Sequence, residues 1–490
     1  MLIHIRYILF LAALVMLVAC EKLVEIDGPI DTITSTEVFN TDVQARTAMA
    51  GVYSKMINGE GGGGGALTEY SGGMVSIFAG LSADELNTSE AEPGNDYFMF
   101  NANKLLFNNP QTENMWKSAY TTIYGANAVI EGIAASTSTR LTDAVRKELT
   151  GEALFVRALS YFYLVNLFGD VPLVLTIDFN QTRYNARSLK EDVYKQIIAD
   201  LLAAQKALPP ENTNAAGDRI YPDKWAATAL LARAYLFAGD HQNAYIQSGA
   251  VIANAGQFHL ETDLLKTFAR TSEEAIFQLK QNVLDNIGNA TSEGMQLIPA
   301  PVVGNPNVLN VRFFLPDKLV EAFEPNDKRF TNWVGISTSN SSGSTKYYPY
   351  KYKTGGQNRV IGAEPTEMYV VLRLAEQFLI RAEAAALGAA AISNAIDDLN
   401  TIRDRAGIDS LPYTLSQPEV LDAVAKERRV ELFMEWGHRW IDLKRTGKAS
   451  TVLSEHPVKQ PWEGDYQLLY PIPSKEMQSN PNLTPNPGYL

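Results

Sequence analysis

Residues 222–255 read PDKWAATALLARAYLFAGDHQNAYIQSGAVIANA, and this stretch predicts two short helices packed against each other. Apolar residues recur at helical spacing over about 222–238 and again over about 241–255. Only Gly239-Asp240 separates the two stretches, so the helices must form a tight hairpin. The small residues let the helices approach closely, and we expect Tyr235 to fill the groove between them.

The spacing within this hairpin matches the tetratricopeptide repeat, a helical hairpin of about 34 residues. The matching residues are Leu231, Ala232, Tyr235, Gly239, Ala244 and Val251. A second match runs through Ala384, Gly388, Ala395, Leu399 and Ile402, with about two extra residues between its helices. Two degenerate matches could also be ordinary helix hairpins, so spacing alone leaves both interpretations open.

The rest of the chain is predicted to be mainly α-helical, with two long irregular segments. Further helices are expected at about 42–57, 111–134, 141–168, 188–208, 366–387, 391–406 and 418–436. The segments 59–110 and 256–365 lack helical periodicity, although 275–279 is strand-like. The glycine run 61–65 is interpreted as a linker, because a nucleotide-binding loop needs a preceding strand and a following Lys-Ser or Lys-Thr.

The N-terminus has the anatomy of a bacterial secretory signal. Residues 1–19 hold one arginine and a short apolar run, which is too short to span a bilayer as a mature helix. Leu17-Val18-Ala19-Cys20 has the form of a lipobox, in which the signal is cut before an acylated cysteine. We therefore predict that Cys20 carries lipid and that residues 20–40 form a tether. The alternative is a simple secretory signal followed by a chance cysteine.

The composition favours a large, well-packed core and argues against a nucleic-acid partner. Apolar residues make up 46% of the 490 residues, which is ample for such a core. The formal net charge is −13, whereas nucleic-acid binding needs a basic surface, so we expect no nucleic-acid partner. Cys20 is the only cysteine, so core packing without disulfides must hold the fold.

Many charged residues fall inside apolar helical stretches. They are Glu152, Arg157, Arg381, Glu383, Arg403, Arg405, Glu427, Arg428, Arg429, Glu431, Arg439, Asp442 and Arg445. Buried charges persist only when they are paired and hydrogen-bonded. We therefore expect ion-pair networks between the helix layers, and nothing in the spacing selects two of the carboxylates as a catalytic pair.

No catalytic, metal-binding or cofactor motif is found in the sequence. The five histidines are scattered, and no two have metal-ligand spacing. No Gly-x-Ser-x-Gly elbow occurs. Sequence alone does not exclude a pair of carboxylates in a cleft, as in a glycosidase. We predict no catalytic residues, no metal and no cofactor.

Several ordered blocks follow the predicted lipobox. They are Leu149–Leu173, Glu321–Phe323, Asn326–Phe330, Arg373–Glu376, Arg381–Ala384, Leu399–Gly407, Glu427–Leu432, Gly437–Arg445, Tyr470–Pro473 and Asn486–Tyr489. In this order they resemble the SusD/RagB family of outer-membrane nutrient-binding lipoproteins of Bacteroidota, over most of the mature chain.

The resemblance implies one SusD-like domain over residues 20–490. Its helical body would hold about four tetratricopeptide-like hairpins, drawn from about 41–58, 111–255 and 366–450. The irregular segments, about 59–110 and 256–365, would face the ligand. The resemblance also implies a lipid-anchored, surface-exposed protein of the outer membrane, with no covalent chemistry of its own. Its partner would be a SusC-like TonB-dependent transporter.

Two segments combine aromatic rings with amides and carboxylates, which is the chemistry that captures sugars. An aromatic ring packs on the C–H face of a sugar, while polar side chains bond to its hydroxyls. The candidate ligand-binding residues are Tyr70, Asp84, Asn87, Tyr97, Phe98 and Asn101 in the first segment, and Trp333, Tyr347 and Tyr350 in the second. The alternative is that these rings pin long loops to the body.

The most favoured function is capture of an oligosaccharide at the cell surface and its delivery to the transporter. A peptide ligand on the same architecture is the first alternative, and it would favour charged anchors over flat aromatic platforms. A lipid-anchored hydrolase and a purely structural helical scaffold are the others.

Overall fold

The helix pair predicted for residues 222–255 forms in the computed structural model as α9 (Lys224–Ala238) and α10 (His241–Ile252). Asp223 caps α9 by accepting hydrogen bonds from two backbone N–H groups. Gly239 ends α9 in the left-handed conformation with φ of 82°, which glycine adopts without steric cost. Asp240 then caps α10, so the chain reverses within two residues.

The structure describes residues 38–59, 67–211, 217–302, 305–338 and 344–489. The predicted signal, Cys20, most of the tether and the glycine run 61–65 lie outside these residues. Within them, no helix is both long and apolar enough to cross a bilayer.

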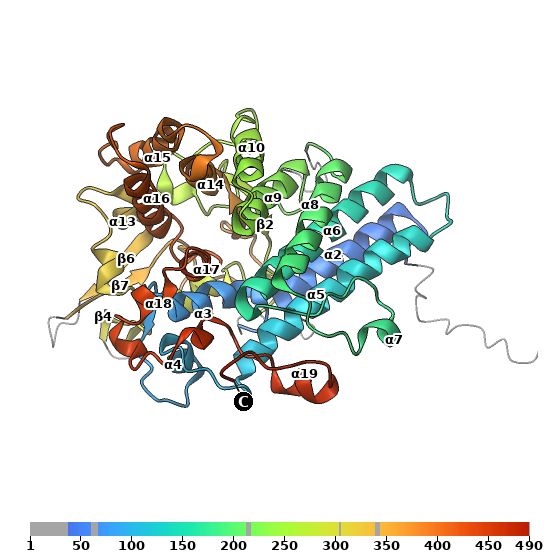
Figure 1. Cartoon of the computed structure of the whole chain (residues 1–490), viewed down its shortest axis with the longest axis horizontal. Helices are drawn as coiled ribbons and strands as arrows, with labels where there is room; N and C mark the ends of the chain where they lie inside the picture. The colour runs from blue at the N-terminus through green and yellow to red at the C-terminus, as the bar shows by residue number, and fades with distance from the viewer. Residues whose placement is uncertain (1–37, 60–66, 212–216, 303–304, 339–343, 490) are drawn as a thin grey trace, which may run out of the picture.

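The body is a row of helices in which each packs on the next (Figure 1). They are α2 (Asp42–Asn58), α5 (Pro110–Ala135), α6 (Asp143–Phe168), α8 (Lys190–Ala207), α9, α10, α14 (Leu374–Ala384), α15 (Ile392–Ala406) and α16 (Gln417–Glu431). The two predicted repeats correspond to the pairs α9 with α10 and α14 with α15. Counted in the same way, the described chain has two further packed pairs, α2 with α5 and α6 with α8, which makes four. The prediction of a mainly helical fold built from hairpins is confirmed.

Small residues lie at the centre of the contact between α9 and α10, and Tyr235 lies at its edge. Ala232 and Ala244 are fully buried where α9 and α10 meet α14. Tyr235 is only part-buried and packs at the edge of this cluster. The expectation that its ring fills the groove is therefore wrong. The distance between packed helices depends on the side chains at the contact, and here two alanines bring the helices together.

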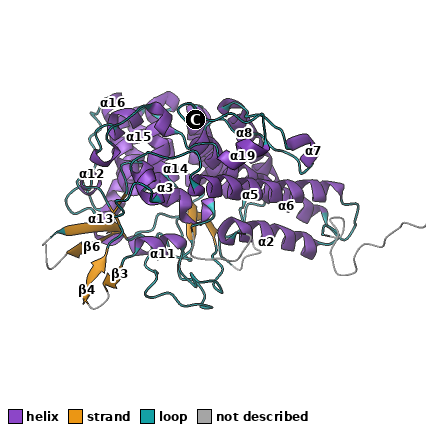
Figure 2. Ribbon diagram, turned by 90° about the horizontal axis from the view of Figure 1, so that it is seen from below, coloured by secondary structure: helices purple, strands orange, loops and turns teal. Residues whose placement is uncertain are grey.

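The second part of the molecule is built from short helices and two-stranded sheets. The short helices of this part are α3 (Val75–Ser82), α4 (Asp96–Asn101), α11 (Ser292–Leu297), α12 (Asp317–Val320), α13 (Lys328–Trp333), α17 (His438–Arg445) and α18 (Ala449–Leu453). Two further short helices, α7 (Phe179–Thr182) and α19 (Ser474–Ser479), lie on the side of the helical body (Figure 2). The antiparallel pairs are β1 (Asn87–Thr88) with β5 (Phe313–Phe314), β2 (Ala275–Leu279) with β8 (Tyr369–Arg373), β3 (Ala300–Val302) with β4 (Asn305–Asn310), and β6 (Val334–Thr338) with β7 (Thr345–Pro349). The strands β3, β4 and β6 lie at the end of the molecule away from α2 and α5 (Figure 2).

Two predicted boundaries are wrong for a common reason. The expected helix 366–387 begins as strand β8, and only from Leu374 is it helical. The expected irregular segment 59–110 contains α3. All five residues of β8 and all eight of α3 are buried, so neither shows the polar and apolar alternation on which sequence periodicity depends.

The buried charges form ion pairs, as the sequence predicts. The largest cluster joins five buried cations to five buried carboxylates: Arg329, Arg373, Arg403, Arg405 and Lys351 with Asp327, Glu274, Glu427, Glu431 and Glu435. At its edge Arg403 also pairs with Glu324, which pairs with the more exposed Lys426. These residues come from β8, α13, α15, α16 and the connecting chain, including Glu274 just before β2, so the cluster ties the irregular part to the helical body. Glu152 is an exception, because its carboxylate accepts a hydrogen bond from the Tyr53 hydroxyl at 2.9 Å.

Candidate ligand-binding site

Three candidate residues of the first predicted segment lie in the interior. Tyr70 and Asn101 are 1% and 2% exposed. Asp84 is buried and accepts from the guanidinium groups of Arg439 and Arg429, each at 2.7 Å. Burial opposes ionisation of Asp84, but the hydrogen bond and charge of Arg439 and the charge of Arg429 lower its pKa to about 2. Asp84 is therefore a structural ion-pair partner and is not available to a ligand.

Trp333 in the second segment is also a core residue. Its side chain is fully buried, and the indole N–H donates to the Leu264 carbonyl at 2.9 Å. The Lys351 ammonium lies 4.6 Å from the ring centroid. The expectation that Trp333 forms a sugar platform is wrong, because the ring instead packs beside the buried ion-pair cluster.

The remaining candidates are part-exposed: Asn87, Tyr97, Phe98, Tyr347 and Tyr350. Strand β5 brings the two predicted segments together. Asn87 of β1 pairs with Phe314 of β5, and the next residue, Leu315, donates its N–H to the Tyr347 carbonyl at 2.7 Å. Phe98 lies on α4, and Tyr350 lies beyond the end of β7 with the Lys353 ammonium 3.9 Å from its ring centroid.

We call the surface around this strand the β5 surface and define it by Asn87, Glu90, Tyr97, Arg312, Phe314, Lys346 and Tyr347. The Arg312 guanidinium carbon lies 4.3 Å from the Tyr97 ring centroid, and Arg312 Nε donates to Glu90 at 2.8 Å. The Tyr97 ring stacks on the core residue Phe78 with centroids 5.4 Å apart. The surface thus holds a cation, a carboxylate and a ring in a fixed arrangement.

The β5 surface carries polar groups that can form hydrogen bonds with a ligand. Asn87 Oδ1 has no hydrogen-bond partner within the described part of the chain. Burial raises the pKa of Tyr97 above its usual value, against the charge of Arg312, so its hydroxyl stays protonated and can donate. Asn87 Oδ1 is buried, so the surface offers Arg312 as a multiple donor, Glu90 as an acceptor, the Tyr97 hydroxyl, and aromatic rings for C–H contacts.

Arg312, Glu90, Phe314 and Lys346 were not among the candidates from the sequence. Lys346 lies with its ammonium 4.5 Å from the Phe314 ring centroid, next to the Ile336–Tyr347 pair of the β6–β7 hairpin. Ile336, which pairs with Tyr347, is 55% exposed. The only sequence signal was Arg312-Phe313-Phe314 itself, a cation beside two rings within the irregular segment 256–365.

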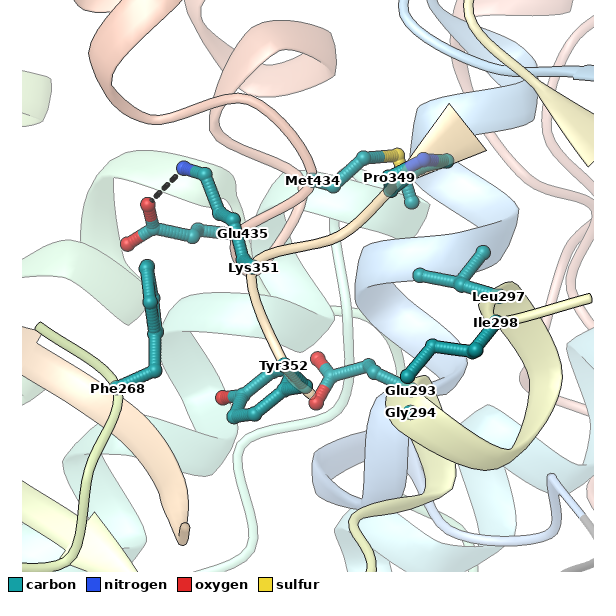
Figure 3. Close-up of a pocket in the computed structure, with 10 residues that line it drawn as sticks. All are labelled: Phe268, Glu293, Gly294, Leu297, Ile298, Pro349, Lys351, Tyr352, Met434 and Glu435. Atoms are coloured by element: carbon teal, nitrogen blue, oxygen red, sulfur yellow. Dashed lines mark hydrogen bonds and ion pairs between the residues drawn. The ribbon is translucent and has the colours of Figure 1, made fainter. Parts of the chain in front are cut away.

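A second group of titratable residues surrounds a small internal cavity (Figure 3). Burial raises the pKa of Glu293 to about 7 and lowers that of Lys351 to about 8, and Lys351 is ion-paired with Glu435. Perturbed pKa values can mark a catalytic site. However, the cavity holds only about 10 Å³, room for about one water molecule, so no substrate fits beside these groups.

The described residues contain no cluster of three or more His, Cys, Asp or Glu side chains that could hold a metal ion. The β5 surface also lacks a nucleophile held by a general base. Its geometry is that of a binding surface, where charged and aromatic groups are fixed by packing against the core.

Comparison with known proteins defines the class of this protein. Residues 68–236 match a family model described as "Starch-binding associating with outer membrane", and residues 317–489 match the model of the SusD family. The chain belongs to the SusD/RagB family, whose members bind glycans in association with the outer membrane and are not enzymes.

Individual relatives agree over nearly the whole chain. The chain is 28% identical to "SusD-like protein P2" of Formosa agariphila, over 98% of this chain and 99% of that protein. A SusD superfamily protein from Bacteroides vulgatus has the same fold, with a TM-score of 0.77 at 21% identity over 92% of this chain and all of that one. A laminarin-binding SusD-like protein matches with a TM-score of 0.74 at 24% identity, again over 92% of this chain and all of that one.

Proposed function

We propose that this protein captures oligosaccharides at the cell surface through the β5 surface and delivers them to a SusC-like TonB-dependent transporter. The observation that carries the proposal is the contact of Arg312 with the Tyr97 ring beside β5. This strand pairs with Asn87, and the residue after it bonds to the backbone of Tyr347, so both predicted segments reach the same strand. Fixed rings and converging polar groups are the features that bind sugars in water.

The relatives support a polysaccharide-derived ligand. One matching family is described as starch-binding, and one matching structure is that of a laminarin-binding protein. Both starch and laminarin are neutral glucans, and a neutral chain of hydroxyl-bearing rings suits the donors and acceptors of the β5 surface. We therefore propose neutral glucan fragments as the first ligands to test.

A peptide ligand has specific support as the second candidate. Arg312 and Glu90 form an exposed ion pair with side chains 39% and 32% exposed, and Lys346 lies nearby. Charged groups of both signs could anchor a peptide's side chains or termini. Native affinity gels containing starch, laminarin or immobilised peptides distinguish a glycan ligand from a peptide ligand, since only the true ligand retards the purified protein.

The anchor and the transporter belong to the same proposal. Lipid on Cys20 would hold the protein at the outer membrane, and a transporter would need to dock on it durably, which calls for at least about 2,000 Å² of buried surface. The test is purification of the native protein from gently solubilised membranes. We expect a large β-barrel transporter to co-purify, and recovery of the lipoprotein alone in several mild detergents would contradict the delivery step.

A further inference from the structure

Large apolar side chains are exposed around α7, on the outside of the helical body (Figure 1). Phe179 is 67% exposed and Tyr184 is 49% exposed, and Leu175 and Ile177, on the chain leading to α7, are 38% and 36% exposed. Single exposed apolar residues are ordinary, whereas a contiguous apolar patch marks an interaction surface. We call this patch the α7 surface and define it by Tyr124, Leu175, Ile177, Phe179, Arg183 and Tyr184.

The patch is contiguous because the chain that leads to α7 runs along one face of α5. Three side chains of α5 hold this chain by hydrogen bonds of 2.8 to 3.1 Å: Tyr120 to the Pro172 carbonyl, Asn127 to the Val174 carbonyl, and Glu131 to the Ile177 N–H. Residues 120, 124, 127 and 131 fall on one face of a helix. Tyr124, which is 56% exposed, therefore lies on α5 beside the same chain.

The α7 surface also carries an exposed cation. The Arg183 guanidinium carbon lies 4.9 Å from the Tyr184 ring centroid and 5.9 Å from that of Phe179, and no carboxylate in the described part of the chain pairs with it. The nearest acid in sequence, Asp178, instead accepts hydrogen bonds from Asn180 and Gln181 at the start of α7. Aromatic and aliphatic side chains beside a basic residue are typical of surfaces that lie in a membrane interface.

The predicted lipid anchor joins the described chain beside this surface. The Phe39 ring packs on Gly132 of α5, and Ser136 Oγ donates to the Phe39 carbonyl at 2.7 Å. Gly132 directly follows Glu131, which holds Ile177, so the start of the described chain and the α7 surface meet at the same end of α5. Residues 20 and 38 are 18 positions apart, and a chain of that length spans at most about 60 Å. A membrane that holds lipid on residue 20 is therefore within reach of the α7 surface.

We infer that the α7 surface rests on the outer membrane, with its apolar side chains among the lipid headgroups and Arg183 beside their anionic phosphates. The inference rests on the lipid anchor of the proposed function. A standard protein interface takes about 20–30 residues a side, whereas a few apolar residues suffice for a shallow contact that a lipid anchor already holds in place. Strand β6, which pairs with Tyr347 of the β5 surface, lies at the opposite end of the molecule from α7 (Figures 1 and 2), so this contact would leave the glycan surface open.

Fluorescence quenching on lipid vesicles tests the inference. The full mature protein carrying Phe179→Trp is anchored in vesicles of phosphatidylethanolamine and anionic phosphatidylglycerol, with or without bromine near the headgroup end of the acyl chains. Bromine quenches an indole that reaches it, so Phe179→Trp should lose more emission than the wild type, whose six tryptophans set the background. Tyr413→Trp is the matched control and should add no quenching, because Tyr413 is 62% exposed in the connection between α15 and α16, far from α7 (Figure 1). Arg183→Gln, combined with Phe179→Trp, should weaken the contact about fivefold on these anionic vesicles.

The outcomes separate this contact from the proposed function. Tyr184→Trp is a second reporter on the same surface and keeps the test valid if Phe179→Trp does not fold. If both reporters are quenched no more than the Tyr413→Trp control, the membrane contact is overturned. If they respond to a co-purified transporter and not to brominated lipid, the surface docks on that partner and the membrane contact is again overturned. Mass spectrometry tells the two failures apart: acylated protein without added quenching refutes the contact alone, whereas an unmodified Cys20 refutes the anchor and this inference with it.

Discussion

Arg373 is the centre of the buried ion-pair cluster, and its removal should destabilise the protein strongly. Its guanidinium donates to Glu435 at 2.7 and 2.8 Å, to Glu431 at 2.6 Å and to Glu274 at 2.8 Å, and its side chain is 2% exposed. Arg373→Met nearly keeps the volume but leaves five buried carboxylates facing four buried cations. Breaking a buried pair by removing one partner costs about 3–5 kcal/mol, a large part of an ordinary folding stability of about 5–15 kcal/mol.

Urea denaturation followed by circular dichroism measures this loss. Arg270→Met is the matched control, because Arg270 pairs with Asp218 at 2.6 Å but is 30% exposed, and such a pair contributes at most about 1 kcal/mol. The double variant Arg373→Met with Glu435→Gln restores the charge balance and should recover part of the loss. If Arg373→Met unfolds at the same urea concentration as Arg270→Met, the cluster does not hold the fold together.

Three further predictions concern the fold and the anchor. Glu293→Gln should become more stable than wild type as the pH rises from about 4.5 through about 7. The folded-state pKa of Glu293 is raised, so the wild type loses stability over that pH range. The melting temperatures of the two proteins should therefore diverge across this range. Tyr235→Ala should cost only about 1–2 kcal/mol because its ring is part-buried, whereas Ala232→Leu should cost more by overpacking the buried α9–α10 contact; equal urea midpoints would contradict this packing. Cys20→Ala should leave the protein unprocessed or mislocalised, and mass spectrometry of mature wild type should find acyl chains on Cys20, so an unmodified thiol there would rule out the anchor.

The helical body could be predicted because apolar residues recur at helical spacing and recognisable turns connect the helices. The hairpin of residues 222–255 has a glycine at its reversal and small residues at its contact, and all of these signals are local. The buried charges were also predictable, since Arg405 or Glu431 inside an apolar stretch must find a partner. Which partner each one finds depends on the tertiary fold, as in the pairing of Arg405 with Glu274, which lies 131 residues away just before β2.

The ligand surface was only partly predictable, for two physical reasons. Composition cannot separate a buried aromatic residue from an exposed one, so Trp333 and Tyr97 looked alike in sequence although one is a core residue and the other half-exposed. The β5 surface also depends on contacts between distant segments. Arg312 reaches Glu90 and Tyr97 only because β5 pairs with β1, and no local pattern indicates that pairing.

The most direct test of the proposed function is isothermal titration of the mature protein with oligosaccharides from starch and laminarin, repeated with Arg312→Ala. Arg312 contacts a ring and a carboxylate on the β5 surface without being buried, so its loss should remove about 1–3 kcal/mol of binding free energy and leave the melting temperature unchanged. Saturable glucan binding that is weakened in Arg312→Ala is the predicted result. Glucan binding of equal strength in the variant, or no binding of any glycan by the wild type, would contradict the account.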